Sequence, residues 1–76
     1  MSKKNIKIGK QYFFYGWDGS KMAMTPVVPV RLEGYHVYAE NPAGDVRAYT
    51  YGDLIEKENA GPYFEHIANL ERAVNA

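Results

Sequence analysis

The stretch K-Q-Y-F-F-Y-G-W-D-G, residues 10–19, places five aromatic side chains within six positions and ends on an Asp-Gly pair. Because successive side chains of a strand point to opposite faces, Tyr12 and Phe14 share one face, and Phe13 and Tyr15 share the other. The Asp-Gly pair predicts a hairpin with a type I′ turn, in which both central residues have positive φ. The stretch therefore indicates a β-hairpin with aromatic side chains on both faces.

The residues before this stretch extend the same alternation. Ile6 and Ile8 continue the phase of Tyr12 and Phe14 if the strand passes Gly9 without a bulge. We therefore expect Tyr12 and Phe14 in the hydrophobic core. The outward residues of the first strand are then Phe13, Tyr15 and Trp17.

The middle of the chain contains prolines and glycines that punctuate further strands. Pro26 and Pro29 lack a backbone N–H, which favours a strand entrance or an edge strand over a central one. Beyond them the alternation changes phase at Gly34, which predicts a long strand bent at that glycine. Pro42 and Gly44 suit a type I turn followed by a left-handed residue, so residues 40–45 should form a second hairpin turn.

The chain is expected to end with a return strand and a helix. Residues 45–55 alternate so as to place Tyr49 and Tyr51 outward, before Gly52-Asp53. Pro62 suits the first position of a helix, which we predict over residues 62–75. One stripe of this helix is apolar and needs a surface to cover it, either the sheet or a second copy of the chain; its members are Tyr63, Ile67, Leu70 and Val74.

Composition is that of one small globular domain of 76 residues, with residues 1–5 expected to be frayed. Hydrophobic residues make up 46%, charged residues 24%, and there is no Cys, which excludes disulfides and fits a reducing cytoplasm. No signal peptide or membrane span is predicted. The net charge is zero, but residues 1–21 carry +4 and residues 53–76 carry −3, a division that a solvated surface also explains.

Residues 6–57 resemble the SH3-like small barrels of the Tudor and KOW type. The likeness lies in an aromatic first strand, an Asp-Gly turn, a long strand with a Gly bend, a tight hairpin and the short closing turn Gly52-Asp53-Leu54. It implies a mainly β fold of four to five antiparallel strands, with the helix added at the C-terminus. Such barrels mostly bind peptides, proteins or nucleic acids, and the fold alone does not fix which.

Nothing in the chain predicts catalysis, a metal or a cofactor. His36 and His66 stand thirty residues apart with no ligand spacing around them, so a metal site would need long-range convergence. The few hydroxyl residues lie outside any nucleophile elbow or phosphate-binding loop. We therefore predict a protein that is not an enzyme.

Exposed Tyr and Trp favour a protein-binding module, because these side chains give large, rigid contact areas with a polar tip. Small size and the lack of catalytic motifs also resemble small phage or mobile-element accessory proteins, including inhibitors of host enzymes. The alternative is a nucleic-acid-binding barrel that uses the N-terminal lysines and stacking aromatics, although zero net charge disfavours it. If the C-terminal helix covers the outward rings, no site remains there; an uncovered helix stripe would instead favour a homodimer. The predicted partner-binding residues are Phe13, Tyr15, Trp17, Arg31, Arg47, Tyr49 and Tyr51.

Overall fold

The computed structural model describes residues 6–75 and shows a mainly β domain with one C-terminal α-helix. The predicted fraying of residues 1–5 lies outside the described residues. The elements are β1 (Tyr12–Trp17), β2 (Met22–Glu33), β3 (His36–Glu40), β4 (Val46–Thr50), η2 (Tyr51–Asp53), β5 (Leu54–Glu56), η3 (Lys57–Asn59) and α1 (Gly61–Asn75), where η denotes a single turn of 3₁₀ helix.

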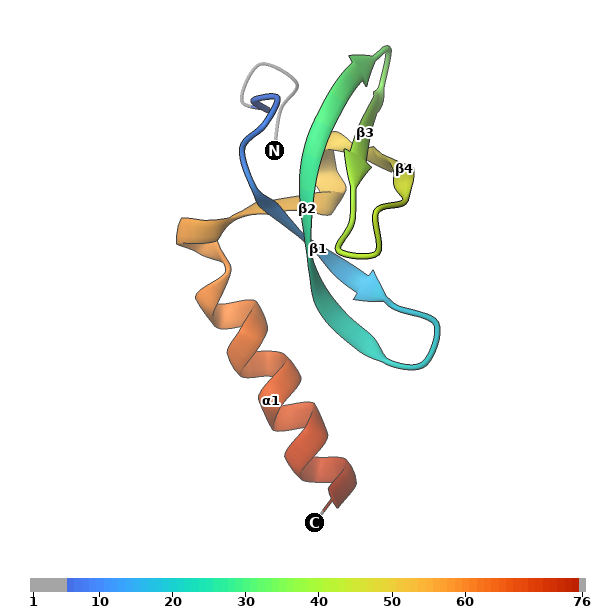
Figure 1. Ribbon diagram of the computed structural model, residues 1–76. Helices are drawn as coiled ribbons and strands as arrows, with labels where there is room; N and C mark the ends of the chain where they lie inside the picture. The colour runs from blue at the N-terminus through green and yellow to red at the C-terminus, as the bar shows by residue number, and fades with distance from the viewer. Residues whose placement is uncertain (1–5, 76) are drawn as a thin grey trace.

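The five strands form one open antiparallel sheet in the order β4-β3-β2-β1-β5 (Figure 1). The long strand β2 joins two halves of this sheet. Its first half pairs with β1, from Tyr12 opposite Val27 to Trp17 opposite Met22. Its second half pairs with β3, and β4 and β5 lie at the two edges. The expected set of antiparallel strands followed by a helix is confirmed.

The prediction that prolines mark a strand entrance or edge is wrong, because Pro26 and Pro29 lie inside β2, opposite Phe13 and Ala39. The reason is that each half of β2 pairs with only one other strand. The N–H and C=O groups of every second residue therefore point away from that strand, and a proline at such a position costs no hydrogen bond between strands. Pro29 shows this directly. Its carbonyl oxygen accepts a hydrogen bond from the Gly9 N–H at 3.0 Å and so points away from β3. The nitrogen of a strand residue points to the same side as its carbonyl, so the missing N–H of Pro29 removes no hydrogen bond to β3.

The predicted bend at Gly34 is also displaced. The pairing register between β2 and β3 shifts between Pro29 and Arg31, so the irregularity lies at Val30. Gly34 and Tyr35 instead form a two-residue turn between Glu33 and His36, which are paired. Gly34 has φ +59°, as the first central position of a type II′ hairpin turn requires. The change of phase in the sequence thus reflects a hairpin rather than a bent strand.

The Asp18-Gly19 turn forms where it is predicted, but its type is different. A type I′ turn needs positive φ at both central residues. Gly19 has φ +108°, but among the described residues only glycines have positive φ, so neither Asp18 nor Ser20 meets this requirement and the predicted type I′ turn is wrong. The carboxylate of Asp18 holds the loop instead, accepting bonds from the backbone N–H groups of Ser20 and Lys21, each at 2.9 Å. These bonds lower the pKa of Asp18 below its ordinary value, with the Lys21 N–H the largest cause. The turn at Pro42 and Gly44 forms as predicted, with Gly44 at φ +86°.

The core lies on the inner face of the bent sheet. Tyr12 is fully buried there, as predicted, and Phe14 is half-buried against the same cluster. The other buried members are Ile6, Val27, Val37, Ala39, Tyr49 and Leu54.

Two predictions about this core are wrong. Residues 6–11 are not strand: the chain turns at Gly9, with φ +84°, which buries Ile6 but exposes Ile8. Tyr49 is not outward, because only 9% of it is exposed and its ring packs at 4.9 Å from that of Phe14. Edge strand β4 turns Tyr49 inward and leaves Val46 exposed, although the alternating pattern itself does not indicate which face is inner.

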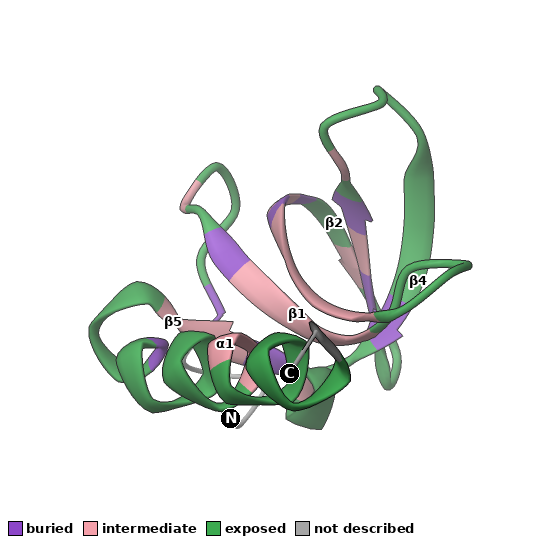
Figure 2. Cartoon of the chain, turned by 90° about the horizontal axis from the view of Figure 1, so that it is seen from below, coloured by how far each residue is buried: buried purple, intermediate pink, exposed green. Residues whose placement is uncertain are grey.

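The helix α1 follows β5 through η3 and runs beside the sheet on its outer side (Figure 1). Figure 2 shows it as mostly exposed, and only Ile67 and Ala68 of its described side chains are half-buried. The predicted span 62–75 agrees with the observed one to within a residue. No helix in the described part of the chain has the length and apolar character to cross a membrane.

Candidate functional site

The outward face of β1 divides into a covered part and an open part. The first turns of α1 cover Phe13 and Tyr15: the rings of Phe13 and Phe64 meet edge to face at 5.1 Å, and those of Tyr15 and Tyr63 lie 5.3 Å apart. Both strand residues are half-buried as a result. Phe13 and Tyr15 therefore belong largely to a second, thin layer of packing between sheet and helix.

Trp17 is the open part. It is the last residue of β1 and is 63% exposed, although an indole ring is usually mostly covered in a folded domain. It lies between two hollows of the surface and contributes to the walls of both. Of the predicted site residues on β1, Trp17 is the one that the structure presents to solvent.

The first hollow lies between the β1–β2 hairpin and the β3–β4 hairpin, and we call it the hairpin hollow. Its volume is about 590 Å³. The segments that form it are far apart in sequence. They meet because β3 pairs antiparallel with the second half of β2, which places Glu40, just before the β3–β4 turn, opposite Val28 near the middle of β2. Its lining residues are Phe14, Trp17, Asp18, Gly19, Thr25, Asn41, Arg47, Ala48, Tyr49 and Asp53.

The charges in the hairpin hollow are unevenly engaged. Asp18 holds its turn, and the Asp53 carboxylate accepts a bond from the Thr50 N–H at 3.0 Å. Arg47 is exposed and has no ion pair with any residue in the described range 6–75. Burial raises the pKa of Tyr49, and the nearby Arg47 charge partly opposes that rise. The hollow thus offers one available guanidinium, an indole wall and a floor of partly buried rings.

Two other predicted residues do not line this hollow. Arg31 stacks on the Tyr38 ring, 4.2 Å from its centroid, and pairs with Glu33 at 3.3 Å. Tyr51 packs against the core, and its hydroxyl donates to the Gly34 carbonyl oxygen at 3.3 Å. The structure therefore brings Trp17, Arg47 and Tyr49 together around the hollow, and Arg31 and Tyr51 lie outside it.

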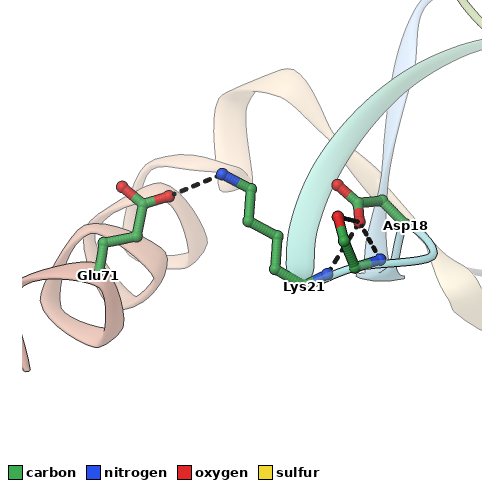
Figure 3. Close-up of polar contacts among 4 residues, drawn as sticks. Asp18, Lys21 and Glu71 are labelled. Carbon is green, nitrogen blue, oxygen red and sulfur yellow. Dashed lines mark hydrogen bonds and ion pairs between the residues drawn. The ribbon is translucent and has the colours of Figure 1, made fainter. Parts of the chain in front are cut away.

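Sequence reasoning did not predict the second hollow, which we call the helix groove. It runs between the β1–β2 hairpin and the last two turns of α1, has a volume of about 730 Å³, and is predominantly apolar. Lys21 and Glu71 both line it, and Figure 3 shows the Lys21 ammonium directed at the Glu71 carboxylate, with which it forms an ion pair at 3.2 Å. The apolar stripe of the helix was the feature of the sequence that could have indicated this groove. Only the fold shows that the C-terminal part of the stripe lines it. Its principal walls are Trp17, Met22, Ile67, Leu70 and Val74.

Within residues 6–75, no group of three His, Asp or Glu side chains comes close enough to hold a metal ion. His66 lies beside Tyr15, with ring centroids 6.3 Å apart, in a shallow apolar recess. Comparisons of the chain with protein families, curated proteins and solved structures find no match.

Proposed function

We propose that this chain is a non-catalytic interaction module that binds another protein at the hairpin hollow. The observation that carries the proposal is the 63% exposure of Trp17 at the rim of a hollow that also holds Arg47. Trp and Arg dominate the energetics of protein interfaces, because both give large contact areas and directional polar contacts. A partner would place an apolar side chain against Trp17 and a carboxylate against Arg47.

The charges favour protein over nucleic acid as the partner. Asp18 and Asp53 line the same hollow as Arg47, so its formal charge is negative, which disfavours a phosphate backbone. The rings predicted to stack on bases are also largely occupied: Phe13 and Tyr15 lie under α1, and Tyr49 lies in the core. A protein partner requires neither a basic surface nor a row of open rings.

We also propose that the sheet is an SH3-like barrel. The strand order, a long β2 shared between two halves, and the 3₁₀ turn η2 between β4 and β5 support this assignment. In such an arrangement the hairpin hollow lies at the mouth between the two halves. An inhibitor of a host enzyme, the class that the sequence suggests, would use this rim to enter the enzyme's cleft.

The test uses the wild-type chain, immobilised, to capture proteins from an extract of its source cells, with two variants at the hollow, Trp17→Ser and Arg47→Glu. Arg31→Glu is the matched control, since Arg31 is also exposed but lies outside the hollow. We expect a protein that wild type and Arg31→Glu retain and both hollow variants lose, with direct binding then measured by calorimetry on the purified pair.

Two results would contradict the proposal. One is a captured protein that all four chains retain equally. The other is binding of DNA or RNA oligomers that weakens steeply with salt, which would favour the nucleic-acid alternative.

A further inference from the structure

Strand β4 stands at one end of the sheet, so that no strand of the described chain pairs with its outer side, which we call the β4 edge (Figure 1). It is five residues long, whereas β5 at the other end of the sheet has three. Natural proteins usually protect such edges with prolines, lysines or bulges. The sequence of β4, Val-Arg-Ala-Tyr-Thr, contains no proline or lysine, and its pairing with β3 is regular. The β4 edge is therefore open to an added strand.

The backbone groups that face the β4 edge belong to Val46 and Ala48. The Asn41 N–H donates to the Asp45 carbonyl oxygen at 2.9 Å, which closes the β3–β4 hairpin and directs the Asp45 carbonyl toward β3. Successive residues of a strand direct their N–H and C=O groups to opposite sides. Arg47 therefore bonds toward β3, and Val46 and Ala48 present two N–H groups and two carbonyl oxygens to the β4 edge.

Charge alternates along the same edge. Asp45 precedes β4 and is exposed, and the exposed Arg47 lies near the middle, with no ion pair to any residue in the range 6–75. At the far end, the Asp53 carboxylate accepts a bond from the outward Thr50 N–H at 3.0 Å. Opposite charges on facing residues of two strands attract, and like charges repel. A segment that pairs with β4 should therefore carry one carboxylate, opposite Arg47, with neutral or basic residues on either side of it.

The same geometry disfavours a second copy of the chain as the occupant. A twofold pair of β4 strands can use all the free backbone groups only if Val46 of each copy lies opposite Ala48 of the other. That register places the two Arg47 side chains directly opposite each other, which is destabilising. Arg47 thus acts against self-association and favours a different chain that supplies a carboxylate.

We propose that the protein partner adds an extended segment to the sheet, antiparallel to β4, with one carboxylate opposite Arg47 and apolar residues opposite Val46 and Ala48. The inference rests on the proposed function and deepens it, because Arg47 and Ala48 also line the hairpin hollow. In this arrangement Arg47 occupies a non-hydrogen-bonded position, where facing side chains lie closest. Val46 is 51% exposed, so an apolar residue opposite it removes apolar surface from water.

A pentapeptide with blocked ends, Thr-Val-Glu-Val-Lys, is the probe for this edge. Paired antiparallel, its glutamate lies opposite Arg47, its valines opposite Val46 and Ala48, and its lysine opposite Asp45. In NMR titrations with up to about 10 mM peptide, the backbone amides of Val46 and Ala48 should shift most. The peptide with glutamine in place of glutamate is the matched control, and it should bind about two- to fivefold more weakly, the effect of one cross-strand charge pair.

A reversal of charge tests the direct pairing. Arg47→Glu should lose the preference for the glutamate peptide and should bind a peptide with lysine at the central position more tightly. Arg31→Glu should keep the wild-type preference, since Arg31 is exposed but lies on β2 and not on β4. The proposal is overturned if the Val46 and Ala48 amides do not shift. It is also overturned if the glutamate and glutamine peptides bind equally well.

The variant Ala48→Pro distinguishes this inference from the proposed function. It removes an outward N–H without removing a bond to β3, and the proline ring blocks the edge. Ala48→Val is the matched control, because it retains the N–H, and thermal melts check that both variants fold. In the capture experiment, Ala48→Pro should lose the partner and Ala48→Val should retain it.

Two results of that capture experiment separate the two proposals. If Ala48→Pro retains the partner that Arg47→Glu loses, the hairpin hollow binds the partner without strand addition, and only the present inference fails. If the glutamate peptide binds at β4 but the hollow variants lose no captured protein, strand addition stands and the proposed function fails.

Discussion

The two faces of β1 differ in how completely they are covered. On the inner face, Tyr12 is sealed among side chains from four other strands and a preceding segment, and no part of it is exposed. On the outer face, Phe13 and Tyr15 contact only the first turns of one helix, and Trp17 is largely exposed to solvent. The five aromatic residues of this stretch thus differ in environment: Tyr12 and Phe14 belong to the core, Phe13 and Tyr15 pack under the helix, and Trp17 is exposed. Segments distant in sequence determine which of them is covered.

The difference has a geometric cause. A bent sheet encloses its inner face by itself, because β2 brings its two halves toward each other. The outer face depends on an added helix that is exposed along most of its length (Figure 2). A domain of this size therefore has one stable core and one surface that is available for partners.

The largest contrast should come from equivalent truncations on the two faces. Tyr12→Ala should lower the free energy of unfolding by about 3–5 kcal/mol, since it opens a cavity in the core. Tyr15→Ala should cost only about 1–2 kcal/mol, because the ring is half-buried under α1. Urea denaturation followed by fluorescence measures both. Equal costs would show that the helix layer is as much a core as the inner face.

A second test adds volume to the inner side instead of removing it. A Cβ at Gly16 would overlap the Phe14 ring, which packs in turn on Tyr49. Gly16→Ala should therefore destabilise the domain by about 1–3 kcal/mol in denaturant melts. Gly52→Ala is the control, because nothing lies near a Cβ there, and it should change stability little. A neutral Gly16→Ala would mean that the Phe14 ring moves aside freely.

The helix contact can be measured by a double-mutant cycle between Phe13 and Phe64, whose rings meet at 5.1 Å. We expect a coupling energy of about 0.5–1.5 kcal/mol, the range for edge-to-face aromatic pairs. The cycle needs Phe13→Leu, Phe64→Leu and the double variant, with thermal or urea unfolding as the readout. A coupling near zero would indicate that α1 does not hold its place on the sheet.

The smallest effect concerns the tip of the β1–β2 hairpin. The pKa of Asp18 is lowered in the folded chain, so its carboxylate stabilises the fold at pH values above its ordinary pKa of 3.8. That contribution is lost as the pH falls below 3.8 and through the lower folded value. The stability of Asp18→Asn should therefore differ most from wild type at neutral pH, and the two should converge in acid. A difference that stays constant from pH 7 to strong acid would contradict this role.

Local sequence signals determined much of this fold. The alternation of β1, the turns at Gly19 and Gly44, and the helix after Pro62 all follow from backbone preferences that act within a few residues. These features do not depend on what lies beside them. The burial of Tyr12 was predicted correctly, but from a strand phase through Ile6 and Ile8 that the structure does not contain, so packing and not alternation accounts for it.

Tertiary structure decided the rest. Gly34 could equally mark a bend or a turn, and Pro29 is tolerated in β2 only because one side of that half-strand faces the Gly9 segment instead of β3. The alternation of β4 is symmetric with respect to its two faces, so only packing against Phe14 places Tyr49 inward. By itself, the sequence determined which residues alternate and where the chain turns. Which rings are covered depends on contacts between segments about fifty residues apart, such as Phe13 with Phe64. No such segment covers Trp17, which is the exposed aromatic of the opening stretch.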